Sequence, residues 1–194
     1  MVLAVLGLNH KTVSVDIREK FSISEESAWD GLLHLSEQEG IKEAVVLSTC
    51  NRTEIYAVLK DEEDKEELYH FFLTLSGNSK AEKEYFFFYT GTECIHHLFR
   101  VVSGLDSMVL GESQILNQIK TAYTGALAVH ATRTILNTLF HRAITTGKRV
   151  RTETRISTSA VSVSYAAVKM AEKILGSLEG KRLSSSARVT RRNF

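Results

Sequence analysis

The sequence predicts an α+β fold: a ferredoxin-like β-α-β-β-α-β sandwich over residues 1–91, followed by a helical part that ends in the start of a long linking helix. Two observations predict it. In the first half, short apolar or aromatic runs alternate with segments of helical spacing, as strands and helices do. From Thr92 onward, apolar residues recur at helical spacing almost without interruption, so the second half is expected to be helical.

Four strands and two helices are expected in the first half. The run from residue 2 to residue 8 is apolar throughout, as in a strand covered on both faces. A helix begins at Ser24, because a serine followed by acids is a typical helix start. A second helix opens with the acidic run 61–67 and buries a stripe that includes Leu68 and Phe72. The expected strands are residues 2–8, 44–47, 53–59 and 85–89.

Three apolar faces of helical spacing follow in the second half. The first face includes Ile115 and Ile119, and the second includes Leu136 and Phe140. The third consists of Val161, Tyr165, Val168 and Leu175. Residues 181–194 have neither periodicity nor an apolar face, and are expected to be a disordered or non-native tail.

Composition and charge bound the class of protein. With 43% apolar and 24% charged residues, the 194-residue chain is an ordinary globular protein and not a disordered one. The net charge of +1 points to no partner, but residues 142–155 carry five Lys or Arg against Glu153. Such a stretch could contact phosphate, although a solvated helix face is the more common explanation. With neither a signal peptide nor a membrane span, a cytoplasmic location is expected.

The two cysteines, Cys50 and Cys94, have neither CxxC nor Cys/His metal spacing, so a disulfide scaffold and a metal site are not expected. Cys50 follows a predicted strand and has the polar neighbours Thr49, Asn51 and Arg52. An isolated cysteine is most often a small buried hydrophobe. Here a neighbouring guanidinium would favour the nucleophilic thiolate, and a turn between strands would expose the thiol while holding it.

Further polar candidates lie between residues 95 and 123. His96 and His97 would diverge on a helix, so only one of them could serve as the base that thiol chemistry needs. Ser113 could cap a helix, and Gln114 and Gln118 lie one turn apart on it, where two amides could grip a polar ligand. Neither pattern identifies a site by itself.

Taken together, five segments resemble glutamyl-tRNA reductase, and the resemblance covers residues 1–180. They are "GLNHKT" at 7–12, "STCNRTEIY" at 48–56, "HLFRVVSGLDSMVLGESQIL" at 97–116, "GKRVRTET" at 147–154 and "SAVSVSYAAV" at 159–168. The resemblance implies that Cys50 attacks the ester of glutamyl-tRNA and forms an enzyme thioester. NADPH then reduces the thioester to glutamate-1-semialdehyde, in the first step of five-carbon tetrapyrrole synthesis.

The same resemblance assigns the remaining roles. His97 matches an activity-relevant histidine. Arg52 would bind the γ-carboxylate of the glutamyl group through its planar fork, and Glu112 its α-ammonium. The basic stretch 148–155 becomes a candidate for contact with the tRNA backbone. The matched pocket positions are Thr49, Asn51, Arg52, Ser107, Glu112, Ser113, Gln114 and Gln118.

The family pattern also implies a domain organisation. Residues 1–155 would be the catalytic, glutamyl-tRNA-binding domain and residues 156–180 a linking (spinal) helix. The sequence contains no GxGxxG fingerprint, so the NADPH-binding and dimerisation domains are expected to be absent and no NADPH is expected to bind this chain. Full-length members are expected to be homodimers that pass product to glutamate-1-semialdehyde aminomutase. Ser14 and Ser113 stand where the family pattern expects proline, which puts loop rigidity in doubt.

Two alternatives remain open from the sequence. The chain could be a non-catalytic ferredoxin-like module that binds tRNA or protein, with Cys50 inert. It could also be a cysteine hydrolase of small esters or amides, which would need His97 or His10 close to Cys50. On the favoured interpretation, the chain alone forms the thioester and loses it to water, and therefore behaves as an esterase.

Overall fold

The computed structural model describes residues 1–154, 156 and 163–176, and its centre is one antiparallel sheet of four strands. The strands are β1 (Val2–Asn9), β2 (Ile41–Ser48), β3 (Arg52–Leu59) and β4 (Phe87–Thr90), and they lie side by side in the order β2-β3-β1-β4. β3 pairs with both β2 and β1, so it lies in the interior of the sheet and all eight of its residues are buried.

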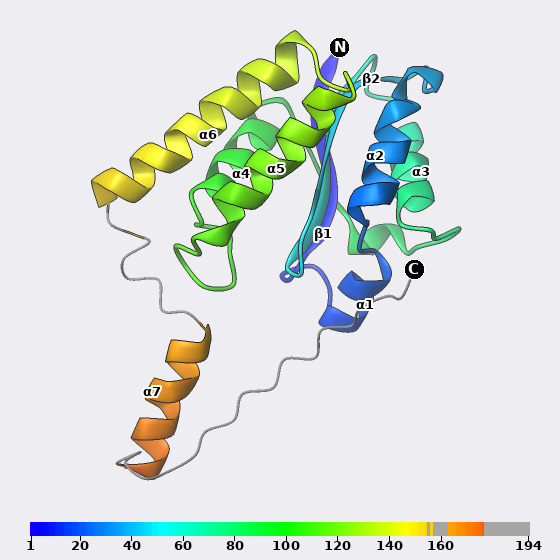
Figure 1. Ribbon diagram of the computed structural model, residues 1–194. Coiled ribbons are helices and arrows are strands. Elements are labelled where there is room, and N and C mark those ends of the chain that lie inside the picture. The colour runs from blue at the N-terminus through cyan, green and yellow to red at the C-terminus, as the bar shows by residue number, and fades with distance from the viewer. Residues whose placement is uncertain (155, 157–162, 177–194) are drawn as a thin grey trace.

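Helices cover both faces of this sheet, which gives three layers (Figure 1). One face carries α2 (Glu25–Leu33) and α3 (Lys65–Leu75). The other carries α4 (Gly91–Val102), α5 (Gln114–Ala128) and α6 (Thr134–Thr154). The first half of the chain therefore supplies one helical layer, and the predicted helical part supplies the other. The remaining elements are α1 (Val15–Lys20), α7 (Val163–Leu175) and the 3₁₀ turns Leu35–Glu37 and Lys83–Tyr85.

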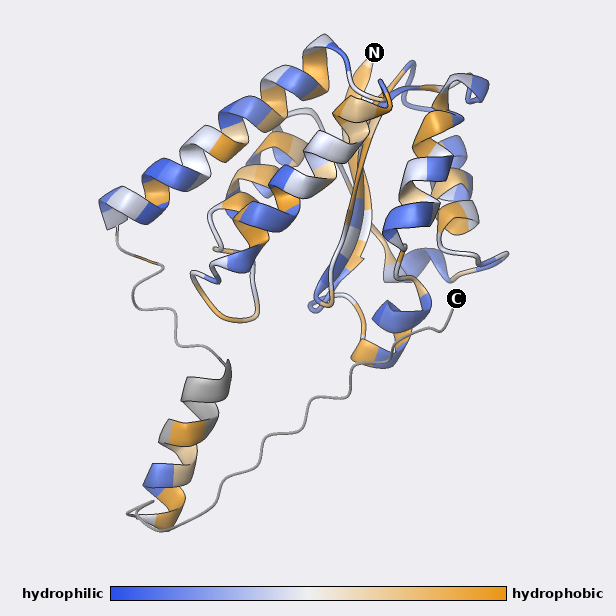
Figure 2. Cartoon of the chain, in the orientation of Figure 1, coloured by the Kyte–Doolittle hydropathy of each residue, from blue (hydrophilic) through white to orange (hydrophobic). Residues whose placement is uncertain are grey.

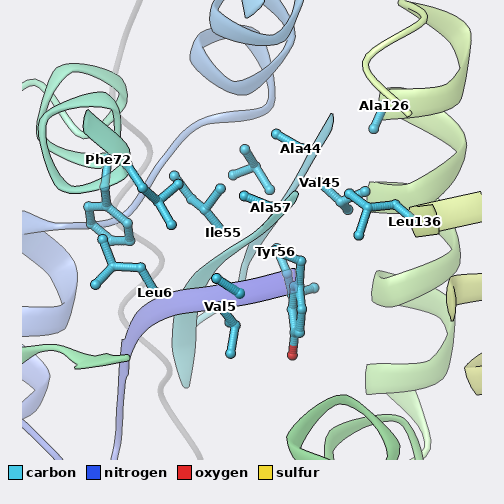
Figure 3. Close-up of a cluster of buried hydrophobic side chains, with 14 of the residues drawn as sticks. Val5, Leu6, Ala44, Val45, Ile55, Tyr56, Ala57, Phe72, Ala126 and Leu136 are labelled. Atoms are coloured by element: carbon cyan, nitrogen blue, oxygen red, sulfur yellow. The ribbon is translucent and has the colours of Figure 1, made fainter. Parts of the chain in front are cut away.

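The alternation of side chains along β3 divides the core between the two layers. Ile55 points with Leu6 toward Phe72 of α3, whereas Tyr56 points toward the opposite layer, where its ring meets Phe140 of α6 at 5.5 Å (Figure 3). Most helix residues that are buried against the sheet are apolar, and the outward faces of the helices are mainly polar (Figure 2). Burial on both faces explains why β1 is apolar almost without a break.

A buried carboxylate joins the helical half to the edge strand β2. Glu43 is 4% exposed, and its two oxygens accept hydrogen bonds from the backbone N–H groups of Arg133 (2.8 Å), Ile135 (3.2 Å) and Leu136 (2.9 Å). These donors open α6 and have no partner within the helix, and a negative charge there is favoured by the helix dipole. Glu43 thus caps α6 from another element of the fold.

The prediction of a mixed fold, with four strands and a helical second half, is confirmed by this architecture. Two strands begin two or more residues away from their expected positions. β2 begins at Ile41 because Glu43, which interrupts its apolar pattern, is buried against α6 at an irregularity in the ladder. β4 begins two residues later than expected, because Tyr85 ends a 3₁₀ turn and packs against Phe21. Helix α1 was not predicted, and none of its residues is buried.

The prediction for residues 156–180 coincides in part with α7, whereas residues 157–162 and 177–180 lie outside the described residues. The predicted tail, residues 181–194, lies entirely outside them.

Candidate active site

Cys50 lies on the short turn between β2 and β3, where its side chain is exposed. The turn is closed by the bond from Thr49 N to Arg52 O (2.8 Å), and the Thr49 hydroxyl accepts from the backbone N–H groups of Asn51 and Arg52, both at 3.2 Å. The N–H of His10, just after β1, donates to Asn51 O at 3.0 Å. The thiol is therefore presented to solvent on a turn whose backbone is fixed from two sides.

Helix α1 supplies a further contact that sequence reasoning missed. Arg18 donates from Nε to the carbonyl of Cys50 at 3.2 Å and from Nη1 to the carbonyl of Val13 at 2.9 Å. A cation thus lies against the backbone of the cysteine, although it comes from another part of the chain. Helix α1 is six residues long and has no apolar periodicity, so no local pattern indicates this placement.

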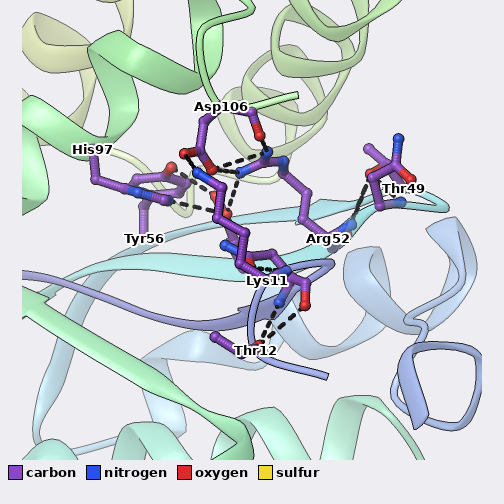
Figure 4. Close-up of polar contacts among 10 residues, drawn as sticks. Lys11, Thr12, Thr49, Arg52, Tyr56, His97 and Asp106 are labelled. Carbon is purple, nitrogen blue, oxygen red and sulfur yellow. Dashed lines mark hydrogen bonds and ion pairs between the residues drawn. The ribbon is translucent and has the colours of Figure 1, made fainter. Parts of the chain in front are cut away.

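Arg52, the expected partner of a substrate carboxylate, lies in the protein interior. Its side chain is 1% exposed, and Nη1 donates to Glu54 Oε1 at 2.8 Å. Nη2 donates to the carbonyl of Asp106 at 2.6 Å, and both terminal nitrogens lie 3.3 Å from Asp106 Oδ2 (Figure 4). The fork expected to face the thiol and a substrate carboxylate is thus already occupied, because Arg52 lies on the face of β3 covered by the helical half.

Glu54 is the centre of this buried network. It is fully buried and accepts hydrogen bonds from Arg52 and from the hydroxyl of Tyr56 (2.7 Å), while His97 Nε2 lies 3.0 Å from its Oε1. Burial alone would raise the pKa of Glu54, but Arg52 and the bonds from His97 and Tyr56 outweigh it and lower the pKa to about 2. The carboxylate is therefore ionised at neutral pH.

Glycine at position 7 makes room for this carboxylate. Gly7 pairs with Glu54 across β1 and β3, and a Cβ there would lie 2.8 Å from both Glu54 Cγ and the carbonyl oxygen of Thr53. Only a residue without a side chain fits between the strands at this point.

His97 is held in the network while its neighbour is not. His97 is 8% exposed, and its ring stacks with Tyr56 and lies 5.0 Å from Phe87. His96 is exposed on the same helix. The expectation that the two diverge is therefore correct. Among the described residues, neither His97 nor His10 hydrogen-bonds to Cys50, and burial, followed by the nearby Arg52, lowers the pKa of His10.

The connection between α4 and α5 approaches this network from the helical half. Its Asp106 binds Arg52 and also Lys11, which extends from the turn after β1 (Figure 4). Lys11 is positioned by that turn, where its backbone N–H donates to the side chain of Asn9 at 2.8 Å. Burial would raise the pKa of Asp106, but Lys11 and Arg52 lower it below its ordinary value.

The predicted pocket residues fall into three groups. Thr49, Asn51 and Arg52 belong to the Cys50 turn, and Ser107, Glu112 and Ser113 belong to the connection between α4 and α5. Gln114 is exposed at the start of α5, whereas Gln118, one turn later, lines a pocket of about 330 Å³ together with Ser48 and Trp29. The Ser113 hydroxyl makes no cap hydrogen bond. The bond between Arg52 and Asp106 joins the first group to the second.

The second cysteine has the opposite character. Cys94 lies inside α4, is 0% exposed, and burial followed by nearby Glu54 raises the pKa of its thiol to about 12. A buried, protonated thiol is a poor nucleophile, so Cys50 is the candidate for thiol chemistry. In the described part of the chain, no group of three or more His, Cys, Asp or Glu could hold a metal ion.

This turn and network lie within a recognisable domain. A family model described as "Glutamyl-tRNAGlu reductase, N-terminal domain" matches residues 6–154. The chain belongs to the glutamyl-tRNA reductase family. Glutamyl-tRNA reductases of Desulforudis audaxviator and Pelotomaculum thermopropionicum are each 48% identical to it over 93% of its length. The structure of "Glutamyl-tRNA Reductase from Methanopyrus kandleri" superimposes with a TM-score of 0.69 at 37% identity and covers 88% of this chain.

The match to glutamyl-tRNA reductases is confined to part of their length. The chain covers 41% of each of the two curated relatives and 39% of the M. kandleri chain, and corresponds to their N-terminal part. Within the described residues, no helix is both long and apolar enough to cross a membrane.

Proposed function

We propose that this chain is the catalytic part of a glutamyl-tRNA reductase in which Cys50 takes the glutamyl group from glutamyl-tRNA. The observation that carries the proposal is the exposed thiol of Cys50 on a turn fixed by Thr49 and His10. A positioned thiolate is a strong nucleophile near neutral pH, and a fixed turn sets its line of attack.

The proposed reaction is an acyl transfer from the ribose oxygen to the Cys50 sulfur. The Cys50 sulfur forms a bond to the ester carbonyl carbon, and the bond from that carbon to the ribose oxygen breaks. The ribose oxygen takes up a proton and leaves as the free 3′ end of the tRNA, while the glutamyl group stays on sulfur as a thioester. His97 is the proposed group for orienting the substrate or assisting proton transfer, and Glu54 fixes its ring.

The glutamyl group would bind beside this turn. The proposed contacts are Thr49, Asn51, Arg52, Ser107, Glu112, Ser113, Gln114 and Gln118. Arg52 can reach a substrate γ-carboxylate only if that carboxylate takes the place of Asp106, because the fork is otherwise filled. After such an exchange a carboxylate still faces the buried guanidinium of Arg52. The guanidinium therefore does not become a buried charge without a partner, which would be costly.

In the whole protein, NADPH would supply the hydride that reduces the thioester to glutamate-1-semialdehyde, for tetrapyrrole synthesis. The described residues offer no glycine-rich strand-to-helix turn for a dinucleotide, so the chemistry proposed for them ends at the thioester. Alone, the chain would form the thioester and lose it slowly to water. The whole protein is proposed to be a cytoplasmic homodimer. It would pass its product to glutamate-1-semialdehyde aminomutase.

The α+β part is proposed to be a ferredoxin-like sandwich. Its strands follow one another as β-α-β-β-α-β apart from the small α1, and β1 lies between β3 and β4 in the sheet. The helical half covers the face that such a sandwich leaves open.

Intact-protein mass spectrometry after mixing with glutamyl-tRNA tests the proposal. The expected result is one glutamyl adduct on the wild-type chain, no adduct on Cys50→Ser, and an undiminished adduct on the matched variant Cys94→Ser. An adduct that survives in Cys50→Ser would refute the role of Cys50. Bound tRNA without any adduct on the wild-type chain would instead support a non-catalytic binding module.

A further inference from the structure

Arg151, near the end of α6, makes contacts unlike those of the other bases around it. Its Nη1 donates to the carbonyl of Ser113 at 2.8 Å and its Nη2 donates to the carbonyl of Glu112 at 3.0 Å. Its Nε is buried and has no hydrogen-bond partner among the described residues. The guanidinium is therefore directed into the protein, where it grips two consecutive carbonyl groups.

The neighbouring bases remain in solvent. Arg149 has a side chain that is 70% exposed and pairs with Glu153 one turn later, and Lys148 is exposed as well. The basic stretch that sequence analysis treated as one phosphate-binding segment thus contains two kinds of residue. Arg149 and Lys148 can meet a polyanion, whereas both terminal nitrogens of Arg151 already donate to backbone carbonyls.

The packing of α6 explains why Arg151 reaches this position. Gly147 lies one turn before Arg151 on the same face, and a Cβ there would lie 2.9 Å from both Cγ2 and the carbonyl oxygen of Val102. The glycine therefore lets α6 approach the end of α4 closely. The chain that leaves α4 at Val102 is the connection whose far end Arg151 holds.

That connection is fixed at both ends by arginines. Near its start, Asp106 is bound by the buried Arg52. Its middle closes on itself through the bond from Gly111 N to Gly104 O (3.0 Å), and both glycines have positive φ, 79° and 73°. Its exit, Glu112 and Ser113, is bound by Arg151. Arg52 ties the connection to the sheet and Arg151 ties it to α6.

From this geometry we propose that Arg151 is a positioning residue for the acyl-transfer site, and not a ligand of the tRNA backbone. It fixes the backbone of Glu112 and Ser113 and so sets where Glu112 and Gln114 meet the glutamyl group. The catalytic consequence of this inference rests on the proposed function, whereas the contacts of Arg151 do not depend on that function. Lysine cannot replace Arg151 fully, because a single ammonium does not span two carbonyls as the planar fork does.

The first measurement separates positioning from tRNA contact. We expect Arg151→Ala to bind glutamyl-tRNA with an affinity within about twofold of wild type and with an unchanged salt dependence. Each lost phosphate contact would instead lower the slope of log K against log salt by about one. Arg149→Ala, from the same stretch, is the matched control for a lost exposed charge. A loss of affinity and of salt slope in Arg151→Ala would overturn the proposal.

The second measurement follows the acyl transfer at saturating glutamyl-tRNA. We expect the single-turnover rate of thioester formation to fall roughly tenfold or more in Arg151→Ala, because small displacements of positioning groups cost that much. Arg151→Lys should fall in between, and guanidinium ion should partly restore Arg151→Ala. A wild-type rate in Arg151→Ala would refute the catalytic consequence.

Hydrogen exchange gives a readout that does not depend on acyl transfer. We expect the amides of residues 104–116 to exchange faster in Arg151→Ala by roughly tenfold, while those of residues 53–59 stay protected and report an intact fold. If wild type forms no thioester but this exchange pattern is seen, the proposed function fails and the positioning contact stands. If residues 104–116 keep their wild-type protection in both Arg151→Ala and Arg151→Lys, the positioning role is refuted.

Discussion

Replacing Glu54 with glutamine would test whether the buried network is held by an ionised carboxylate. The change keeps the shape of the side chain but removes the charge that faces Arg52, His97 and the hydroxyl of Tyr56. Glutamine also presents two N–H donors where three donors already converge. We therefore expect Glu54→Gln to fold but to lose a large part of the stability of the wild-type chain.

The magnitude follows from the pKa of Glu54. Its ordinary value of 4.5 is lowered to about 2 in the folded chain, and this difference corresponds to about 3 kcal/mol of stability. Because the folded pKa is the lower one, the contribution is fully present above pH 4.5. It is lost as the pH falls toward 2, and about 1 kcal/mol remains at pH 3.

Urea unfolding followed by circular dichroism, at pH 7 and at pH 3, measures this contribution. At pH 7 we expect the free energy of unfolding of Glu54→Gln to lie about 3 kcal/mol below that of wild type, and the gap to shrink to about 1 kcal/mol at pH 3. Glu66→Gln, which alters an exposed pair with Lys83, is the control and should match wild type. A gap below 1 kcal/mol at pH 7, or one that does not change with pH, would refute the reasoning.

Three further substitutions test the packing around the site, each by urea unfolding at pH 7. Gly7→Ala should lower the free energy of unfolding by about 1–3 kcal/mol, because its Cβ would meet a backbone oxygen of β3; unchanged stability would mean that the strands can separate. Glu43→Ala should cost about 2–3 kcal/mol by leaving the first amides of α6 unpaired, and a cost below 0.5 kcal/mol would mean that water replaces the carboxylate. Ser14→Pro should add about 0.4–1 kcal/mol, since φ at Ser14 is −66°, and a loss would show strain at the preceding residue.

Local sequence patterns were sufficient to predict the strands of the sheet and the Cys50 turn. The apolar runs place the strands, and three polar residues around a cysteine at a strand end predict an exposed thiol on a turn, where the structure has it. These features depend on residues that are neighbours in the sequence, so they can be predicted from the sequence alone. Helix α1 could not be found in this way, because none of its residues is buried and its Arg18 acts on a residue 32 positions away.

The role of Arg52 could not be read from the sequence for a related reason. On β3, the residues that alternate with Ile55 and Ala57 include Arg52 and Glu54, and charged residues at alternate positions are typical of a solvent-exposed face. Here that face is covered by α4 and α6, which come from the second half of the chain. The partners of Arg52 and Glu54, Asp106 and His97, lie 54 and 43 residues further along.

The buried network also bears on how the two halves depend on each other. Lys11 and Glu54 come from the α+β half, whereas His97 and Asp106 come from the helical half. If the helical half were separated, the face of the sheet that carries Glu54 and Tyr56 would lose its cover, and Arg52 would lose Asp106. Breaking a buried ion pair by removing one partner costs several kcal/mol. This is a large part of the free energy of unfolding of a typical domain. The change of sequence pattern near residue 92 therefore marks a change of secondary structure and not an independent folding unit, and the Cys50 turn depends on both halves.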